Sequence, residues 1–283
     1  MTAQILDGRT TAREIADDVR AQVQAIVQRG APQPTIAVVR AGDDPASVRY
    51  AGQIERAFRG AGMGFQLDVL PESVGQDELE QLLLRLGADE AVHAILVQFP
   101  LPSHLSRERA ADTIAPIKDV DGVSPLNAGR LFLGRGRYLA PATPLGGVEL
   151  LRRRGIQIAG RHAVVVGRSD IVGRPLAMLL LQENATVTIC HSRTPDLARF
   201  TRQAEILAAA TGKPGLIDGD MIAPGAVVLD FGMNLVDGKL VGDIDFNAVA
   251  AIASAITPVP GGTGPMTNAM LLANTLEAYR RQQ

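Results

Sequence analysis

A glycine turn between a short apolar strand and a helix is the first stretch of this 283-residue chain with the chemistry of a binding site. Residues 162–175 have the sequence HAVVVGRSDIVGRP, in which Gly167 opens the turn and Gly173 stands at the start of the helix. Backbone N–H groups and the positive end of the helix dipole meet at such a turn, and both attract phosphate. The common dinucleotide fingerprint is G-x-G-x-x-G, but here Ser169 replaces the middle glycine and the spacing is wider. Two interpretations stay open, a phosphate-binding loop and a tight connection.

The turn after the next strand of this half bears on the choice of nucleotide. It contains His191, Ser192, Arg193 and Thr194. NAD sites normally carry an acidic residue here, which binds the ribose hydroxyls. Arginine and hydroxyl groups instead suit the extra phosphate of NADP, because guanidinium pairs with phosphate, and Arg168 adds a second guanidinium. The alternative is a solvated loop with a stray arginine.

The first half of the chain places polar residues at the ends of predicted strands. Tyr50 lies on the helix that follows DDPAS, Gln98 ends a strand, and Asp119 and Asp121 belong to the run KDVDG. A carboxylate at the carboxyl end of a parallel strand is well placed to bind a ligand. An aspartate there can equally do no more than form the turn. The segment PVPGGTGPMT near the C-terminus has the same two interpretations, a ligand contact or a rigid turn.

Composition and charge exclude several classes of function. The formal net charge of −2 gives no electrostatic reason to expect nucleic acid or an anionic membrane as a partner, so a small soluble ligand is expected. Cys190 is the single cysteine, which rules out an internal disulfide, and His93, His104 and His162 lack metal-ligand spacing, so no metal is expected. The chain has no secretory signal or long apolar run, and we expect a cytoplasmic protein.

Short β-branched runs alternate with helical patterns along the chain, which predicts an α/β fold with parallel sheets. Strands are expected at residues 35–40, 65–70, 94–99, 162–166, 186–190, 205–210 and 226–231. Helices are expected at residues 10–29, 46–61, 76–86, 146–154 and 266–281. Residues 100–145 are rich in proline and glycine and are expected to form loops and a domain joint.

Ten blocks of sequence, spread over almost the whole chain, carry a resemblance to a known family. They are GDDPAS, ILVQFPLP, KDVDG, NAGRL, ATPLGGV, VVVGRSDIVGRP, CHSRT, GKPG, GDID and TPVPGGTGPMT. Through them the chain resembles the bifunctional methylenetetrahydrofolate dehydrogenase/cyclohydrolase family. The resemblance implies a folate-binding catalytic domain over residues 1–142, onto which a C-terminal helix, 266–283, packs back. It also implies a Rossmann-like NADP-binding domain over 143–265 and a homodimer.

The family passes a hydride from 5,10-methylenetetrahydrofolate to NADP, and water then opens the methenyl product to 10-formyltetrahydrofolate. By resemblance, Tyr50 packs on the folate, Asp121 fixes the pterin ring and Gln98 positions a catalytic lysine. The remaining implied folate contacts are Pro260, Gly261 and Gly262. The implied NADP contacts are Gly167, Arg168, Ser169, Val172, Gly173, His191, Ser192, Arg193 and Met233.

The catalytic lysine itself is absent, because Ile54 stands four residues after Tyr50 where the family has lysine. Residues four apart share a helix face, so Ile54 is expected to point into the folate site. Loss of a positioned acid/base group costs about 10²- to 10⁴-fold, here mainly in the hydrolysis step, whereas hydride transfer depends more on alignment. We therefore predict an NADP-dependent dehydrogenase of one-carbon metabolism with weak or lost cyclohydrolase activity.

Two alternatives remain. One is a fully bifunctional enzyme in which another group or water takes over the proton transfers. The other is a catalytically silent paralogue that binds folate or NADP as a regulatory or structural subunit. A further departure is Phe231, where the family usually has valine; it is expected to narrow the nicotinamide site.

Overall fold

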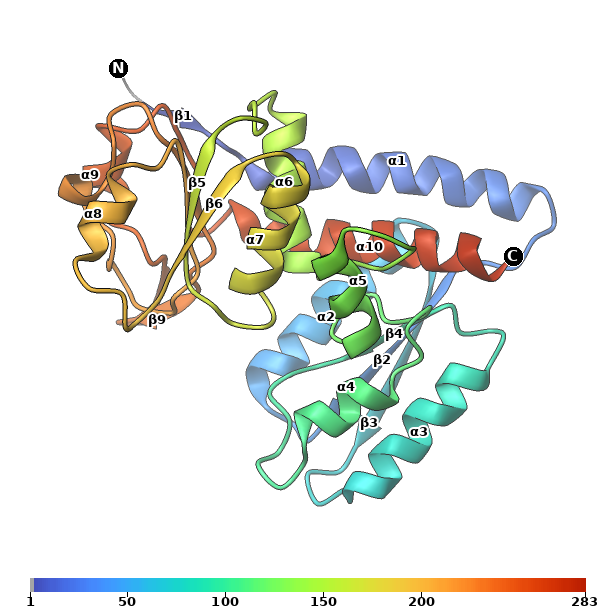
Figure 1. Cartoon of the computed structure of the whole chain (residues 1–283). Helices are drawn as coiled ribbons and strands as arrows, with labels where there is room; N and C mark the ends of the chain where they lie inside the picture. The colour runs from blue at the N-terminus through green and yellow to red at the C-terminus, as the bar shows by residue number, and fades with distance from the viewer. Residues whose placement is uncertain (1–2) are drawn as a thin grey trace. The chain divides into compact units, whose positions relative to one another are not determined.

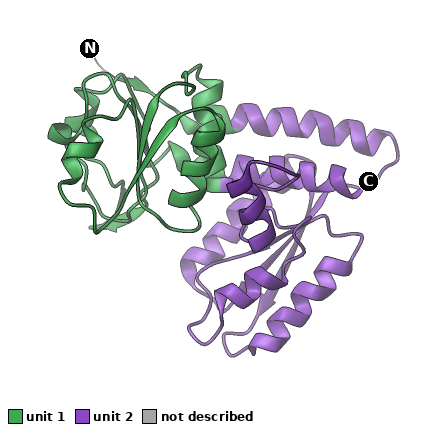
Figure 2. Cartoon of the chain, in the orientation of Figure 1, with its two compact units in different colours: residues 1–12, 143–267 green, residues 13–142, 268–283 purple. Residues whose placement is uncertain are grey.

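A computed structural model of the chain describes residues 3–283 (Figure 1). Contacts divide the chain into two compact units, coloured separately in Figure 2. Unit 1 contains residues 1–12 and 143–267, and unit 2 contains residues 13–142 and 268–283. The predicted domains differ at the N-terminus: residues 1–12 belong with unit 1, because Gln4 and Ile5 pair with Ala255 and Ile256 of that unit.

Unit 1 is built on a six-stranded sheet in which every pairing is parallel. In spatial order the strands are β1 (Gln4–Ile5), β11 (Ala255–Ile256), β8 (Val227–Asp230), β7 (Ile206–Ala209), β5 (His162–Val166) and β6 (Thr186–Cys190). Residues 163–166 of β5 are almost completely buried, because helices cover both faces of a parallel sheet. The chain order reverses at β5, which lies between β6 and β7, and ligands of such folds bind at the carboxyl ends of strands beside this reversal.

Helices lie on both sides of this sheet (Figure 1). Those of unit 1 are α6 (Ala142–Arg153), α7 (Gly173–Gln182), α8 (Leu197–Thr201), the 3₁₀ turn η1 (Gly219–Met221) and α9 (Phe246–Ala250). Apolar residues of α8 and α9, such as Leu197 and Val249, pack with Val164 and Leu207 of the sheet in one core. A separate antiparallel hairpin joins β9 (Asn234–Val236) and β10 (Lys239–Val241) after the end of β8.

Unit 2 contains a three-stranded parallel sheet in the order β3-β2-β4. The strands are β2 (Thr35–Ala41), β3 (Gly64–Leu70) and β4 (Ala94–Val97), and the helices are α2 (Pro45–Gly60), α3 (Gln76–Ala88), α4 (Arg107–Thr113) and α5 (Pro125–Leu133). Side chains alternate between the faces of a strand. Val39 and Val97 therefore point to one face and pack with Leu79 and Leu83 of α3. The other face of the sheet is covered by α2 (Figure 1).

Two helices of unit 2, α4 and α5, lie in residues 100–145, where the composition predicted loops. That prediction was wrong at these places. Ser106 caps α4 by accepting the backbone N–H of Arg109 at 3.1 Å, and Pro125 begins α5 with the φ angle that a helix requires. Helix α6 likewise begins at Ala142, four residues earlier than predicted.

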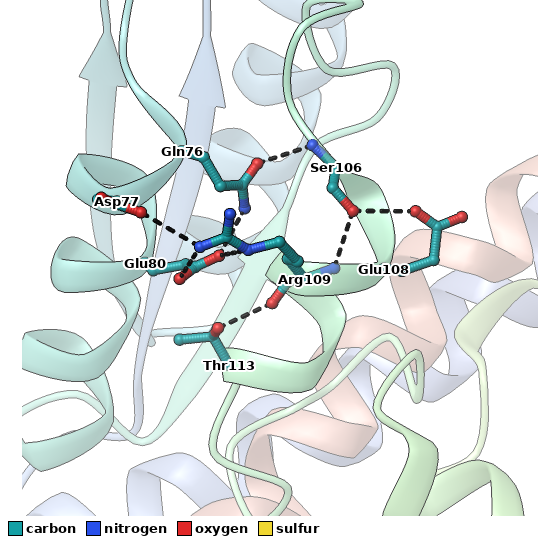
Figure 3. Close-up of polar contacts among 7 residues, drawn as sticks. All are labelled: Gln76, Asp77, Glu80, Ser106, Glu108, Arg109 and Thr113. Carbon is teal, nitrogen blue, oxygen red and sulfur yellow. Dashed lines mark hydrogen bonds and ion pairs between the residues drawn. The ribbon is translucent and has the colours of Figure 1, made fainter.

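Helix α4 is tied to α3 by the polar network that Figure 3 shows. Arg109 Nε lies 2.8 Å from Glu80 Oε1, and Arg109 Nη2 donates to Asp77 Oδ1 at 3.1 Å. The backbone N–H of Ser106 donates to Gln76 Oε1 at 2.7 Å. Exposed ion pairs contribute about 0–1 kcal/mol each, so this network chiefly fixes the position of α4.

Two long helices begin in one unit and continue in the other by residue number, α1 (Gly8–Gln28) and α10 (Thr263–Gln282). Within unit 2, Asn274 of α10 is buried, and its Nδ2 donates to Val120 O at 2.8 Å and to Ala140 O at 2.9 Å. These two bonds fix the backbone beside Asp121. Among residues 3–283, no helix has the length and apolar composition that crossing a membrane requires.

Candidate functional site

The nucleotide turn, residues 167–173 of unit 1, is closed so tightly that two of its residues must be glycine. A Cβ on Gly167, whose φ is +134°, would lie 2.2 Å from the carbonyl oxygen of Ala210. A Cβ on Gly173 would lie 2.3 Å from the carbonyl oxygen of Gly167. Both distances are shorter than any real contact, so the helix start packs directly onto the turn. This geometry supports a backbone-lined site.

Ser169 caps the helix that follows the turn. Its Oγ accepts the backbone N–H of Val172 at 3.2 Å and that of Gly173 at 3.3 Å. The hydroxyl thus stands at the positive end of α7, where an anion would also lie. Arg168 beside it is exposed.

A second turn follows β6 at the same edge of the sheet. Strands β5 and β6 pair in parallel up to Val166 and Cys190, so the residues after them are neighbours. In this second turn the backbone N–H of His191 donates to Thr194 Oγ1 at 2.9 Å, and that of Arg193 to His191 Nδ1 at 3.1 Å. Ser192 and Arg193 are exposed. The structure therefore brings two exposed arginine-bearing turns to one edge, as phosphate binding requires.

A buried carboxylate, which the sequence analysis did not single out, organises the end of β8. Asp230 accepts the backbone N–H groups of Gly232 at 2.8 Å, Asp243 at 3.0 Å and Ile244 at 3.1 Å. Burial raises the pKa of Asp230 to about 6, against the opposing effect of these bonds. The carboxylate fixes the backbone from which Met233 projects, 70% exposed. Its sequence signal was an aspartate at the end of an apolar strand.

Phe231 occupies space that another residue leaves free. A Cβ on Gly147 of α6 would lie 2.4 Å from Phe231 Cζ. The missing side chain at Gly147 thus makes room for the ring beside the end of β8. The expected narrowing of a nicotinamide site by Phe231 stays a prediction.

The segment that contains Pro260, Gly261 and Gly262 is a packed turn of unit 1. The backbone N–H of Gly8 donates to Gly261 O at 3.0 Å, and a Cβ on Gly8 would lie 1.8 Å from Gly262 O. Gly261 and Gly262 are buried, whereas Pro260 is exposed. The close approach explains the glycine at position 8, while Gly261 has a φ of +115° and a Cβ on Gly262 would lie 2.6 Å from Pro258 O. Pro260 is the part of this turn that a ligand can reach.

In unit 2 the charged residues of the run KDVDG differ in their surroundings. Asp119 is completely buried and accepts the backbone N–H of Ser124 at 2.8 Å and the side-chain N–H of Asn127 at 3.0 Å. The Lys118 ammonium is also buried and donates to Leu86 O and Asp89 O. Both residues hold the loop together. Asp121 is the member left for a ligand.

Asp121 lies close enough to Tyr50 for its charge to act on the phenol. Burial first, and then the charge of Asp121, hold the pKa of Tyr50 well above its ordinary value. Burial and the neighbouring Asp119 raise the pKa of Asp121 to about 7, against the opposing effects of the Ala142 backbone N–H and of Arg107. Tyr50 therefore keeps its proton at neutral pH, while Asp121 exchanges its own and can both donate and accept hydrogen bonds.

Ile54 and Gln98 both lie on the side of the sheet that α2 covers. Gln98 is buried, and its Nε2 donates to the backbone oxygen of Ser47 in the first turn of α2 at 3.3 Å. Ile54 has no exposed surface, and it belongs to the buried stripe of α2 with Ala51 and Phe58. The side chain of Ile54 therefore packs in the core of unit 2 and carries no polar atom, and its orientation toward the folate stays a prediction.

Arg40 is a residue that sequence reasoning missed. It lies in β2 and is only 7% exposed, and its Nη1 lies 3.2 Å from Asp43 Oδ1. The signal was available, since an arginine in the otherwise apolar strand TIAVVRA needs a reason. Among residues 3–283, no group of three or more His, Cys, Asp or Glu side chains is placed to hold a metal ion.

Two protein-family models match most of the chain. Residues 6–121 match the catalytic domain of tetrahydrofolate dehydrogenase/cyclohydrolase, and residues 141–283 match the NAD(P)-binding domain of the same enzymes. The chain is 53% identical to a bifunctional protein FolD of Chloroflexus aurantiacus over 281 residues, which cover 99% of this chain and 98% of the relative.

Solved structures agree with this similarity. The bifunctional methylenetetrahydrofolate dehydrogenase/cyclohydrolase of Campylobacter jejuni superimposes with a TM-score of 0.97 at 41% identity, over 99% of this chain and 100% of that one. The enzyme of Trypanosoma brucei, solved with NADP cofactor and an inhibitor, superimposes with a TM-score of 0.94 at 39% identity, over 99% of this chain and 98% of that one.

Proposed function

Because the chain belongs to the tetrahydrofolate dehydrogenase/cyclohydrolase family, we propose that it oxidises 5,10-methylenetetrahydrofolate with NADP and hydrolyses the methenyl product to 10-formyltetrahydrofolate. The observation that carries this proposal is the full-length similarity to a bifunctional relative, 53% identity over 99% of the chain. Similarity of this extent covers both the folate-binding and the nucleotide-binding halves.

The proposal replaces our sequence-based prediction that hydrolysis is weak or lost. That prediction rested on Ile54 alone, and the comparisons do not support it. The relatives matched along their whole length are named bifunctional, which favours the alternative of a fully bifunctional enzyme. Since Ile54 carries no polar atom, we propose that other groups of unit 2 provide the polar contacts of the hydrolysis step.

For the cofactor, we propose that the nucleotide turn and the turn after β6 hold NADP. The contributing residues are Gly167, Arg168, Ser169, Val172, Gly173, His191, Ser192, Arg193 and Met233. The two exposed arginines support NADP over NAD, because guanidinium pairs bidentately with phosphate. When bound, the cofactor supplies a hydride acceptor. The turns fix its position through backbone and hydroxyl groups.

For the folate, we propose that Tyr50, Gln98 and Asp121 of unit 2 provide contacts. The protonated phenol of Tyr50 offers an aromatic face and an O–H donor. A carboxyl group with a pKa of about 7 matches the adjacent donor and acceptor atoms of a pterin ring, since it can present either partner. The homodimer and the cytoplasmic location stay predictions.

A single assay tests this function. The purified protein receives 5,10-methylenetetrahydrofolate and NADP, and NADPH and the methenyl intermediate are followed together. We expect NADPH to form while methenyl stays low, and added methenyl to disappear at a rate proportional to enzyme. NADPH formation with accumulating methenyl contradicts the hydrolysis part. NADP binding in a calorimeter without either reaction indicates the silent paralogue.

A further inference from the structure

Five buried polar side-chain atoms of unit 2 have no hydrogen-bond partner within the described part of the chain, and three of them belong to β2 or to the residue directly after the neighbouring strand β4. These three are Nε and Nη1 of Arg40 and Oε1 of Gln98. Arg40 is 7% exposed and Gln98 is 4% exposed. A buried polar group without a partner destabilises a fold by about 1–3 kcal/mol, and more where it is charged. Such groups are therefore candidates for contacts with a ligand or an ordered water.

The strand register places Arg40 and Gln98 side by side. Val39 of β2 pairs with Val97 of β4, and the backbone N–H of Gln98 donates to Val39 O at 2.9 Å. Arg40 follows Val39 within β2, and Gln98 directly follows the last residue of β4, so their side chains point to the same face, opposite to Val39 and Val97. This is the face that α2 covers, because Gln98 reaches Ser47.

The bonds already made at this point determine which atoms remain available. Gln98 Nε2 is engaged with Ser47 O, which leaves the carbonyl oxygen of the amide unpaired. Arg40 Nη1 makes only an ion-pair contact with Asp43, whose carboxylate is 87% exposed, whereas Nε–H is a buried donor with neither a hydrogen bond nor an ion-pair contact. One buried N–H donor and one buried oxygen acceptor therefore remain at the carboxyl ends of neighbouring parallel strands.

We propose that Arg40 and Gln98 hold the water molecule that attacks the methenyl carbon in the hydrolysis step. This inference rests on the proposed function. The water accepts the Nε–H bond of Arg40 and donates one O–H bond to Gln98 Oε1. It keeps one lone pair and one hydrogen, and the free lone pair is what a nucleophile needs. An arginine stays protonated in a protein, so Arg40 orients the water and takes no proton from it.

The reaction balances with water as the only co-reactant. The water oxygen forms a bond to the methenyl carbon, the carbon–nitrogen π electrons move to the cationic nitrogen, and one proton leaves the added oxygen for solvent. The second proton of that oxygen is transferred through solvent to the ring nitrogen. The bond between this nitrogen and the carbon then breaks, and the formyl carbonyl forms. The net change is methenyl cation plus water to formyl product plus one proton.

Position 54 has a defined place in this arrangement. Ile54 lies seven residues after Ser47 on the same buried stripe of α2 and contributes no polar atom. Arg40 is a buried cation on this face of the sheet, on the same strand as the buried residues Ile36 and Val38. A cation is thus present beside Gln98 although the helix carries none.

Substitution of Arg40 tests the proposal. We expect Arg40→Met to lower kcat for methenyl hydrolysis about 10²-fold, the usual cost of removing one well-aimed donor, and to leave NADP reduction within about threefold. Arg40→Lys should recover part of the hydrolysis, since it restores a buried donor. Arg59→Met removes an exposed arginine of the same unit and should change neither rate.

The outcomes separate this inference from the function on which it rests. Wild-type protein without methenyl hydrolysis contradicts the proposed function. Wild-type hydrolysis that survives Arg40→Met, or an equal fall of both activities, overturns only the role of Arg40. Because Arg40→Met can also disturb folding, a crystal structure of the ligand-free wild type gives a second test. We expect an ordered water between Arg40 Nε and Gln98 Oε1, and a direct bond between these two atoms overturns the proposal.

Discussion

The nucleotide turn of unit 1 is formed by backbone, whereas the polar group of unit 2 is formed by side chains from distant positions. In the turn, Gly167 and Gly173 approach other backbone atoms so closely that no side chain fits. In unit 2, burial raises the pKa of Asp121, and polar atoms of Arg40 and Gln98 are buried without hydrogen-bond partners. A backbone site therefore needs particular residues at fixed spacing, and a side-chain site depends on what the fold places around it.

The largest effect of a substitution is expected at Gly173, where the start of α7 packs against the backbone of the nucleotide turn. In Gly173→Val the new side chain begins 2.3 Å from the Gly167 carbonyl oxygen, so the turn must open. We expect NADP affinity in a calorimeter to fall by about 10²-fold or more, because a displacement of about 1 Å has effects of that size. Gly264→Ala is the control, since its Cβ would meet nothing within 4 Å. Unchanged affinity in a folded Gly173→Val protein contradicts the backbone site.

The next effect concerns the carboxyl group of unit 2. With a folded-state pKa of about 7, Asp121 keeps a proton that the unfolded chain has already lost, and the free energy of unfolding falls as pH rises from about 4 to about 7. Asp121→Asn should make this fall less steep in urea titrations. It should also slow both reactions about 10- to 100-fold, the value of a hydrogen bond to a charged group.

Asp230 also contributes to the pH dependence of the free energy of unfolding. Its pKa, raised to about 6, has the same sign of effect, so part of the slope should remain in Asp121→Asn. Asp112→Asn, an exposed aspartate of α4, serves as the matched control. If the free energy of unfolding falls equally steeply with pH in wild type and in Asp121→Asn, the Asp121 carboxyl group is not the group that keeps its proton in the folded state.

A smaller effect is expected from the arginine turn. Arg193→Ala removes a guanidinium beside the nucleotide turn and should weaken NADP binding about tenfold while NAD binding changes little, since only NADP has the extra phosphate. Arg199→Ala, an exposed arginine of α8, is the control. Equal weakening of NADP and NAD assigns Arg193 to general charge attraction, and the choice of nucleotide then comes from elsewhere.

The comparison also explains what the sequence could predict. Alternating apolar runs located the strands within a few residues: the run at 205–210 became β7, Ile206–Ala209, and the run at 226–231 became β8, Val227–Asp230. Helices α4 and α5 were missed because seven and nine residues are too few to show a period of 3.6 against frequent prolines. Their signals were local caps, Ser106 and Pro125, rather than patterns.

In the candidate site, too, backbone features were predictable from the sequence and side-chain environments were not. Glycine spacing indicated the turn at Gly167, since backbone geometry limits which residues are allowed. The sequence could not show that Ile54 would be buried or that Arg40 would lack partners, because burial depends on α2 covering the sheet. Asp119 and Asp121, two residues apart, have different roles for the same reason: hydrogen bonds from Ser124 and Asn127 reach only the first.

The smallest effect is expected at position 54, and it separates packing from catalysis. Ile54→Val removes one methyl group from a side chain with no exposed surface. The free energy of unfolding should fall by about 1 kcal/mol, and both reaction rates should stay within about twofold of wild type. Urea titration and the coupled NADPH and methenyl assay measure the two quantities. A tenfold loss of hydrolysis in folded Ile54→Val protein places this side chain in the reaction, whereas unchanged hydrolysis beside a large loss in Arg40→Met assigns the polar contacts to β2 and β4.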